Sequence, residues 1–302
     1  MSNVVTLTHE ASGSVAQVNL FGATVTSFVA QGEEHLFLSP LAKLDGSKAI
    51  RGGIPLVFPI FGPSKGDSTM PQHGFARCNY WKHVETKSVG DLATVGVFEL
   101  LYSRDVTAGC GENNPWHKET ATQDGTDVKL TYEVRVEAAE LTTTLTIENV
   151  GSSSFDFQAL QHTYLQVQDS SVVQIQGLGG YAITDKVSGD SGHVQSYEEP
   201  VTIAGKEVDA VYVHPDDHPT LHATVAPTRV RVEAAGQVND QVAPVSCVVW
   251  NPAAEKAAAM SDFANDGYKT MVCVEPGLLG HQALLKPGNK ASLSQSLLIH
   301  HD

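Results

Sequence analysis

Short stretches in which apolar and polar residues alternate occupy most of the chain. Alternation with a period of two is typical of β-strands that bury one face. Residues 127–137 and 141–150 flank a short link and predict a β-hairpin. The other predicted strands are residues 4–10, 14–20, 23–30, 33–39, 80–88, 93–103, 154–168, 171–180, 228–235, 243–251, 271–277 and 291–300.

Few stretches favour a helix. Residues 253–263, AAEKAAAMSDF, are rich in alanine, the strongest helix former, and predict about two helical turns. Residues 107–119 are polar and rich in turn formers, which predicts a surface excursion. We find no repeat, low-complexity tract or linker. The pattern therefore predicts an all-β fold, a large antiparallel β-sandwich with few short helices, as a single domain over residues 1–302.

One long segment, residues 50–77, departs from the strand pattern. Its first half is apolar, yet prolines stand at every fourth position from Pro55 onwards. Because proline lacks a backbone donor, the segment is neither a helix interior nor a central strand. Arg51 and Arg77 lie at its two ends. We expect a buried wall of a binding site; the alternative is a surface loop pinned by apolar residues, although IPLVFPIF is very apolar for a solvated loop.

Composition excludes some classes of partner. The 302 residues are 41% hydrophobic and 18% charged, as in a globular protein with a sizeable core. The 19 basic and 34 acidic residues give a formal charge of -15, which argues against nucleic acid and anionic membranes as partners. We expect no signal peptide and no membrane span, and hence a soluble cytoplasmic monomer. The four cysteines lack C-x-x-C spacing, so we expect reduced, buried thiols, with disulfides as the alternative.

Two polar residues stand inside otherwise apolar strands. On a strand, period-two alternation places Leu160, His162 and Tyr164 on one face, and the residues between them on the other. A buried histidine there is either a satisfied structural residue or a functional one. Glu275 follows the apolar run MVCV and precedes Pro-Gly, where we expect the strand to end at a turn. Because burying a lone carboxylate costs several kcal/mol, Glu275 is either exposed at a rim or held for chemistry.

Five sequence blocks, taken together, carry a family resemblance. RGGIPLVFPIFGP, PQHGFAR, QHTYLQV, VVWNP and MSDFANDGYKTMVCVEPG follow one another between about residues 45 and 280. They resemble the signature blocks of the hexose-6-phosphate mutarotases, or glucose-6-phosphate 1-epimerases, a branch of the galactose-mutarotase-like (aldose 1-epimerase) superfamily. The resemblance implies a large antiparallel β-sandwich that binds a sugar on a concave face.

The resemblance also implies roles for individual residues. His162 stands where the family has its general acid, and Glu275 stands where it has its general base. The implied substrate-binding residues are Arg51, Gln72, His73, Arg77 and Asp209, with the arginines facing the phosphate. The family needs no cofactor and no metal, and the chain carries neither a G-x-G-x-x-G fingerprint nor a P-loop.

Three residues depart from the family's pattern. Gln161 stands where leucine is common, Ala210 where arginine is common, and Ala253 where tryptophan often follows. The first precedes the implied general acid. The other two bear on the phosphate and ring contacts.

The implied function is a mutarotase that interconverts the α and β anomers of a hexose 6-phosphate, with glucose 6-phosphate as the expected substrate. A guanidinium binds phosphate through two parallel hydrogen bonds, so two arginines in one segment favour a phosphosugar. Alternatively, each arginine forms a structural salt bridge. Two other functions stay open: an aldose 1-epimerase for unphosphorylated sugars, and a non-catalytic sugar-binding sandwich protein.

Overall fold

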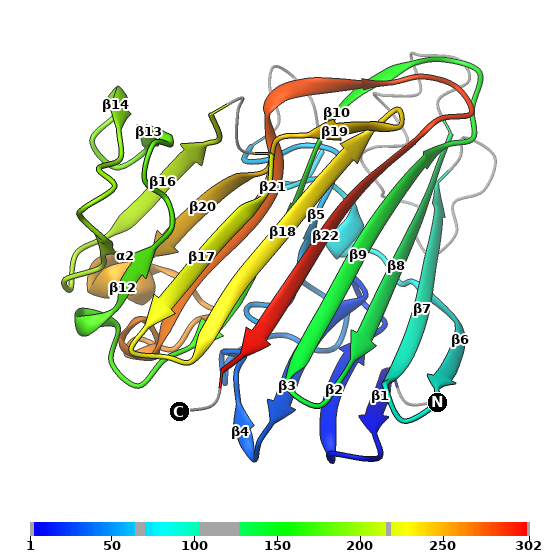
Figure 1. Ribbon diagram of the computed structural model, residues 1–302, viewed down its shortest axis with the longest axis horizontal. Helices are drawn as coiled ribbons and strands as arrows, with labels where there is room; N and C mark the ends of the chain where they lie inside the picture. Colours follow the sequence, from blue (N-terminus) through cyan, green and yellow to red (C-terminus); the bar gives the residue numbers. More distant parts are fainter. Residues whose placement is uncertain (1–2, 64–69, 103–126, 216–218, 301–302) are drawn as a thin grey trace.

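Three antiparallel sheets form nearly all of the regular structure (Figure 1). The computed structural model describes residues 3–63, 70–102, 127–215 and 219–300, so the predicted surface excursion at 107–119 lies outside the described residues. The smallest sheet consists of β1 (Val4–His9), β2 (Ser14–Asn19), β3 (Thr24–Ala30) and β4 (Glu33–Glu34), in that order.

The two large sheets face each other. Along the eight-stranded sheet lie β14 (Ser191–Val194), β13 (Ala182–Asp185), β16 (Val208–Val213), β20 (Ser246–Asn251), β21 (Met271–Leu285), β10 (Phe155–Gln161) and β5 (Leu56–Val57), while β11 (Tyr164–Gln166) pairs with β21. Along the ten-stranded sheet lie β15 (Val201–Thr202), β12 (Gln174–Gln176), β17 (Leu221–Ala226), β18 (Val230–Val238), β22 (Lys290–Ile299), β9 (Glu140–Asn149), β8 (Val128–Val136), β7 (Ala93–Tyr102) and β6 (Lys82–Val89), while β19 (Gln241–Ala243) pairs with β18.

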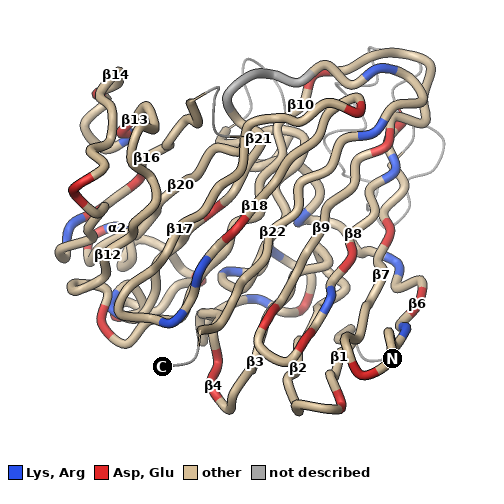
Figure 2. Tube along the Cα trace, viewed as in Figure 1, with Lys and Arg blue, Asp and Glu red and all other residues tan. Residues whose placement is uncertain are grey.

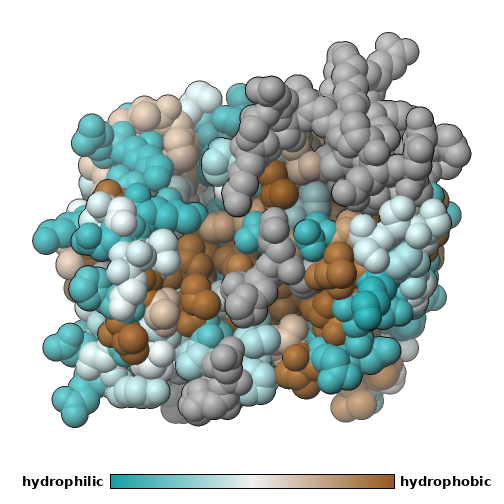
Figure 3. Space-filling model, turned by 90° about the horizontal axis from the view of Figure 1, so that it is seen from above, coloured by the Kyte–Doolittle hydropathy of each residue, from teal (hydrophilic) through white to brown (hydrophobic). Residues whose placement is uncertain are grey.

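The main core fills the space between these layers. β10 and β21 pack on β22, while β1 and β2 pack on β8, so the two smaller sheets together cover one face of the ten-stranded sheet. Along β9 every second residue is buried, which is the alternation that the sequence shows. Seen from the end where β10 and β21 lie, apolar side chains gather between hydrophilic margins (Figure 3). Charged positions are separated by long neutral stretches of strand (Figure 2).

The all-β prediction is confirmed. β8 and β9 form the predicted hairpin, and α2 (Ala253–Ala259) supplies the predicted helical turns. The remaining described helices are single 3₁₀ turns: η1 (Ala76–Cys78), η3 (Ser170–Val172) and η4 (Gly267–Thr270). The β13–β14 hairpin was not predicted, because its residues are mostly exposed and polar and show no apolar alternation. Within the described part of the chain, no helix is long and apolar enough to cross a membrane.

The prediction that the strand of Glu275 ends at Pro276 is wrong. β21 continues through Pro276 to Leu285. The backbone N–H of Val274 donates to the Thr163 carbonyl, so even-numbered residues of this stretch direct their N–H groups towards β10 and β11. The missing N–H of Pro276 therefore faces Gln161, the last residue of β10, whose carbonyl instead accepts from the Thr163 N–H, so the proline breaks no ladder hydrogen bond.

The segment 50–77 is buried and irregular, as predicted. Ile54 and Phe58 are fully buried, and the described residues of the segment contribute the two-residue strand β5, at the edge of the eight-stranded sheet, and the start of η1. Its prolines donate no hydrogen bond, but the carbonyls of Pro55 and Pro59 accept hydrogen bonds from the backbone beside and within β10. The segment thus lies along β10 as an extended wall.

Gly53 provides a test of this close packing. Its φ is +66°, and a Cβ built there would lie 2.0 Å from the Val25 carbonyl oxygen. We expect Gly53→Ala to lower the free energy of unfolding by at least about 1–3 kcal/mol, measured by urea denaturation. Gly32→Ala is the control, since Gly32 has a similar φ of +80° with no atom near its Cβ position. Equal losses in the two variants would show that the clash is relieved at no cost.

Candidate active site

His162 and Glu275 lie opposite each other on neighbouring strands. β10 pairs Leu160 with Gly277, and β11 pairs Tyr164 with Cys273, in one unbroken register. His162 occupies the gap between β10 and β11 and therefore stands across from Glu275 of β21. The prediction that His162 and Tyr164 lie on the same face of the strand is confirmed, since their rings stack with the centroids 4.7 Å apart. The outer face of the eight-stranded sheet thus presents both side chains to the same space.

The pair is buried and incompletely hydrogen-bonded. His162 is 7% exposed and Glu275 is 1% exposed, which excludes the exposed rim position for the glutamate. The Nδ1 of His162 lies 3.3 Å from the Oε1 of Glu275, while the Oε2 of Glu275 has no hydrogen-bond partner among the described residues. A buried polar atom without a partner is costly, and such atoms are often kept for a ligand.

Burial moves the two pKa values in opposite directions. Loss of solvation, followed by the positive Arg77 and Arg51 and the nearby His73, lowers the pKa of His162 well below its ordinary value. Loss of solvation and the negative Asp209 raise the pKa of Glu275 well above its ordinary value, against the opposing effect of Lys186 and Arg77. In the free protein, the lowered pKa of His162 and the raised pKa of Glu275 together favour a neutral imidazole beside a protonated carboxyl group.

Arg51 and Arg77 reach the site from the two ends of the irregular segment. Arg51 donates to the Tyr164 hydroxyl at 3.3 Å, and its Nε lies 3.4 Å from Asp262. The burial of Asp262 opposes ionisation, but Arg51 and Lys48 together hold the pKa of this carboxyl below its ordinary value. Arg77 donates to the Gln72 carbonyl, while its Nε has no hydrogen-bond partner in the described structure. Both guanidiniums therefore retain donors for an anion.

Asp209 lies on the other side of the pair, between two lysines. Its oxygens are 3.7 Å from the Nζ of Lys186 and 3.6 Å from the Nζ of Lys256. Lys186 also lies over the Phe61 ring, 3.8 Å from its centroid, and Lys256 forms an ion pair with Glu207 at 2.7 Å. These contacts hold Asp209 at the cavity, where its oxygens can accept hydrogen bonds from sugar hydroxyls.

His73 is held as a neutral donor. The backbone N–H of Gly62 donates to the Nδ1 of His73 at 3.1 Å, so we assign the ring proton to Nε2. Burial, together with the positive Arg77, Lys186 and Arg51, lowers the pKa of His73 to about 2. The ring meets that of His162 edge to face, with the centroids 5.8 Å apart. His73 can therefore donate a hydrogen bond to a sugar oxygen without changing its charge.

All seven predicted site residues line one cavity of about 440 Å³. The structure thus brings together Arg51, Gln72, His73, Arg77, His162, Asp209 and Glu275. Sequence analysis missed Lys186, Lys256 and Trp250, which also line it. Lys186 lies in a polar stretch and Lys256 on an alanine-rich helix, and neither context signals a site. Trp250 belongs to the VVWNP block but received no role.

The two alanines that depart from the family's pattern do not line this cavity. Ala210 is buried on the inner face of β16, within the main core. Ala253 begins α2, with a φ of +51°, and donates its N–H to the Asn251 side chain. Gln161 also points away from the cavity, towards the ten-stranded sheet.

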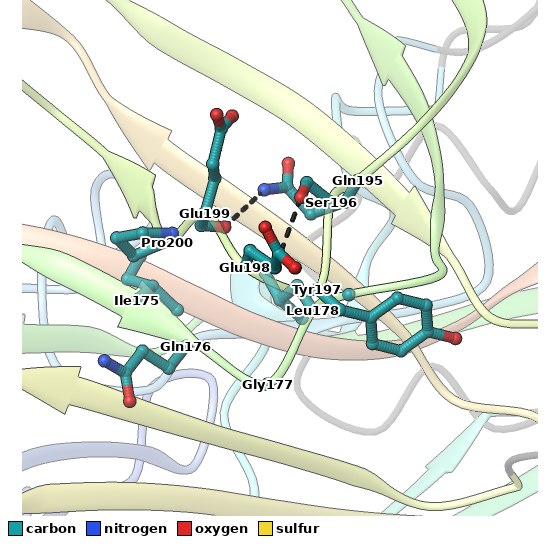
Figure 4. Close-up of a pocket in the computed structure, with 11 residues that line it drawn as sticks. Ile175, Gln176, Gly177, Leu178, Gln195, Ser196, Tyr197, Glu198, Glu199 and Pro200 are labelled. Carbon is teal, nitrogen blue, oxygen red and sulfur yellow. Dashed lines mark hydrogen bonds between the residues drawn. The ribbon is translucent and has the colours of Figure 1, made fainter.

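A second hollow, of about 370 Å³, lies between residues 175–179 and 195–200 (Figure 4). Gln195 donates to the Glu199 carbonyl, and the Ser196 hydroxyl accepts from the Glu198 N–H, so its polar groups partly satisfy each other. Its carboxylates are exposed and it contains none of the predicted site residues. It offers no buried acid–base pair.

One cluster has the donor types of a metal site. His162, Cys273 and Glu275 place one possible ligand atom each within 4.8 Å of one another. Zinc bonds of about 2.0–2.3 Å hold tetrahedral ligands roughly 3.3–3.8 Å apart, so the cluster would have to contract to bind this ion. The expected absence of a metal stays a prediction. Cys78, Cys247 and Cys273 are free thiols. Cys247 and Cys273 are buried as expected, Cys78 is only partly buried, and Cys110 lies outside the described residues.

Comparison with known proteins gives a family match over nearly the whole chain. Residues 3–298 match the family model described as aldose 1-epimerase. Two relatives carry the name "Putative glucose-6-phosphate 1-epimerase". The one from Escherichia coli (strain K12) is 30% identical over 285 residues, covering 94% of this chain and 86% of its own length. The one from Cenchrus ciliaris is 29% identical over 292 residues, covering 91% and 78%.

Solved structures share the architecture. A crystal structure from Salmonella typhimurium, named as a "putative mutarotase", superimposes with a TM-score of 0.75 at 25% identity and covers 96% of this chain and 88% of that one. Galactose 1-epimerase from Lactobacillus acidophilus has a TM-score of 0.67 at 15% identity, covering 96% and 92%. The second likeness is one of fold alone.

The depressed pKa of His73 predicts a pH-dependent stability. Below pH 6.5 the unfolded chain binds a proton on this histidine that the folded protein does not bind, so folding stability is lost as the pH falls. Between pH 6.5 and 5 we expect His73 to contribute a loss of up to about 1.4 kcal/mol per pH unit. His73→Asn should flatten the slope, because asparagine keeps an acceptor and tolerates the φ of +68°. Urea denaturation across this range measures both slopes; parallel slopes would contradict the buried neutral state.

Proposed function

Because the chain belongs to the aldose 1-epimerase family, we propose that it is an enzyme that interconverts the α and β anomers of a hexose 6-phosphate, with glucose 6-phosphate as the expected substrate. One observation carries this proposal: a buried histidine and glutamate face each other at 3.3 Å in a cavity that also holds two arginines. The pair supplies acid–base chemistry, and the arginines supply a place for a phosphate.

The reaction needs one proton removed and one proton added. Glu275 takes the proton from the O1 hydroxyl while His162 gives a proton to the ring oxygen. The bond between C1 and the ring oxygen breaks, C1 becomes an aldehyde, and rotation about the C1–C2 bond exposes its other face. Reversal of both transfers then closes the ring to the other anomer. Each positioned transfer contributes roughly 10²–10⁴-fold to the rate.

The free pair holds the one proton that this reaction requires. In the free protein that proton favours Glu275, whereas the reaction needs it on His162. Arg51 and Arg77 both disfavour a charged His162, and a bound phosphate dianion would neutralise them. Substrate binding would therefore favour the imidazolium, and with it the ionised base. Unphosphorylated glucose lacks this effect.

The charges around the pair give the sugar an orientation. Arg51 acts on His162 and Arg77 acts on both groups, whereas Asp209 and Lys186 act on Glu275. The ring oxygen adjoins the carbon that bears C6, so a phosphate at the arginine side places the ring oxygen near His162. O1 and its neighbouring hydroxyl then lie near Glu275 and Asp209. We assign Gln72 and His73 to hydrogen bonds with the sugar.

The other functions are less well supported. An enzyme for unphosphorylated sugars would leave the free donors of Arg77 without an anion. A non-catalytic sugar-binding protein would have no use for an incompletely hydrogen-bonded acid–base pair. That the protein acts as a monomer in the cytoplasm stays a prediction.

Replacing the base tests the chemistry. We expect Glu275→Gln to reduce the rate of anomer exchange by roughly 10²–10⁴-fold, because the amide keeps the shape but cannot accept the proton. The rate is measured by exchange NMR with glucose 6-phosphate, and the fold by circular dichroism. Glu148→Gln, on β9 and outside the cavity lining, is the matched control. Near-wild-type turnover in folded Glu275→Gln would refute the assignment.

Removing an arginine tests the substrate class. Arg51→Ala or Arg77→Ala should raise KM for glucose 6-phosphate by roughly 10- to 150-fold, since a hydrogen bond to a charged group contributes about 1.5–3 kcal/mol. Lysine at either position should restore binding only in part, because it keeps the charge but cannot make the two parallel hydrogen bonds of a guanidinium. The residual rate with glucose should not fall.

Arg135→Ala is the control for loss of an arginine elsewhere, since Arg135 pairs with Glu137 on the ten-stranded sheet. It should leave both substrates unaffected. If the arginine variants of the cavity lost activity towards glucose and its 6-phosphate by the same factor, the phosphate contact would have to be abandoned.

A further inference from the structure

The two residues that flank His162 in sequence are tied to the opposite sheet. Gln161 and Thr163 point away from the cavity, into the space between the eight-stranded and ten-stranded sheets, and both are fully buried. Most of this space is filled by apolar side chains. A group of buried polar residues directly behind the proposed acid therefore needs an explanation.

Gln161 uses its whole side-chain amide. Its Nε2 donates to the backbone carbonyls of Leu293 at 3.0 Å and Thr143 at 3.3 Å. Its Oε1 accepts from the Thr143 hydroxyl at 2.6 Å and from the Tyr132 hydroxyl at 3.3 Å. These partners come from three neighbouring strands of the ten-stranded sheet, β22, β9 and β8. The amide is thus held from several directions.

Thr163 makes a second tie to the same sheet. Its hydroxyl donates to the Gln295 Oε1 at 2.7 Å, and the Gln295 amide in turn lies 3.5 Å from the Thr143 hydroxyl. Thr143 and Gln295 face each other in the register of β9 and β22. The two ties therefore converge on one cross-strand pair and form a closed network.

The backbone between the two ties bends at His162. The Thr163 N–H donates to the Gln161 carbonyl at 2.9 Å, an i to i+2 bond that forms a γ-turn centred on His162. This turn separates β10 from β11 and interrupts the ladder that both strands form with β21. The His162 N–H donates to the Pro55 carbonyl, so the turn is also held by the segment 50–77. The position of the ring depends on how this short turn is fixed.

We propose that Gln161 and Thr163 are positioning residues, which clamp the turn at His162 to the ten-stranded sheet and thereby set the His162 ring against Glu275. The proposal rests on the proposed function for its kinetic consequence only. Buried polar groups whose hydrogen bonds only offset the cost of their own burial would contribute to the stability of the core and nothing more. Here two ties, one on each side of a single bent residue, hold the point at which the acid must be placed.

Thr163→Val and Gln161→Leu test the clamp. A misplacement of about 1 Å can cost roughly 10²-fold in rate, so we expect kcat for glucose 6-phosphate to fall by about 10- to 100-fold. KM should stay within about twofold, because the arginines that we assign to the phosphate are not part of the network. Thr163→Ser keeps the hydroxyl and should restore kcat. Thr163→Val keeps the shape of threonine, so it still tests the clamp if Gln161→Leu folds poorly.

Val232→Ala is the control, since Val232 is fully buried on β18 but its apolar side chain cannot hydrogen-bond to the network. It should lower the thermal midpoint while leaving kcat unchanged well below that temperature. Leucine is common at the position of Gln161 in the family, so Gln161→Leu asks whether this chain depends on its own network. If Thr163→Val and Gln161→Leu behaved like Val232→Ala, with lost stability and unchanged kcat, the network would be structural only and the proposal would fail.

A second readout does not depend on activity. The Tyr164 ring stacked on His162 shifts the NMR signals of the imidazole protons, which are assigned by their loss in His162→Asn. These signals should move in Thr163→Val and Gln161→Leu and stay in place in Val232→Ala. An inactive wild type would overturn the proposed function, while moved signals would still support the clamp. Unmoved signals would overturn the clamp whether or not the enzyme is active.

Discussion

Burying His162 and Glu275 opposite each other is costly, and much of the surrounding structure can be understood through that cost. Both groups are buried and have lost most of their contact with water, and one glutamate oxygen has no hydrogen-bond partner in the described residues. An ion pair there would lose solvation that the Coulomb attraction does not fully return, so the free pair favours its neutral form. Two large sheets with an extensive apolar core supply the stability that such a site needs. The network behind His162 adds rigidity at the point where the ladder is broken.

The second constraint is charge. The protein carries a formal charge of -15, yet the proposed substrate is close to a dianion. Repulsion from distant carboxylates is screened beyond about 8 Å, so the cations that line the cavity decide the local potential. Arg51 acts on His162 and Arg77 acts on both members of the pair, while Lys186 and Lys256 flank Asp209 on the other side. This separation allows a phosphate at one end of the sugar and hydroxyls at the other.

Much of this could be predicted from the sequence, for physical reasons that also mark the limit. Period-two alternation predicted most of the strands and the facing of His162, because a half-buried strand must alternate, but β13, β14, β16 and β17 were missed. Motif resemblance gave the seven residues that the structure brings to one cavity. Lys186 and Lys256 were not predicted as site residues, because their contacts with Asp209 exist only once strands distant in sequence have packed together. The course of β21 through Pro276 was not predicted either, since the strand end that accommodates the proline belongs to β10. The hydrogen-bond partners of Gln161 could not be predicted either, because they lie on other strands of a different sheet.

The most direct test of the central claim is exchange NMR on the wild-type protein, with glucose 6-phosphate and glucose measured in parallel against their spontaneous rates. We expect the anomers of glucose 6-phosphate to exchange much faster than without protein, and those of glucose to stay close to the spontaneous rate. Equal acceleration of both sugars would contradict the role of the phosphate. No acceleration of either sugar would contradict the assignment as a mutarotase.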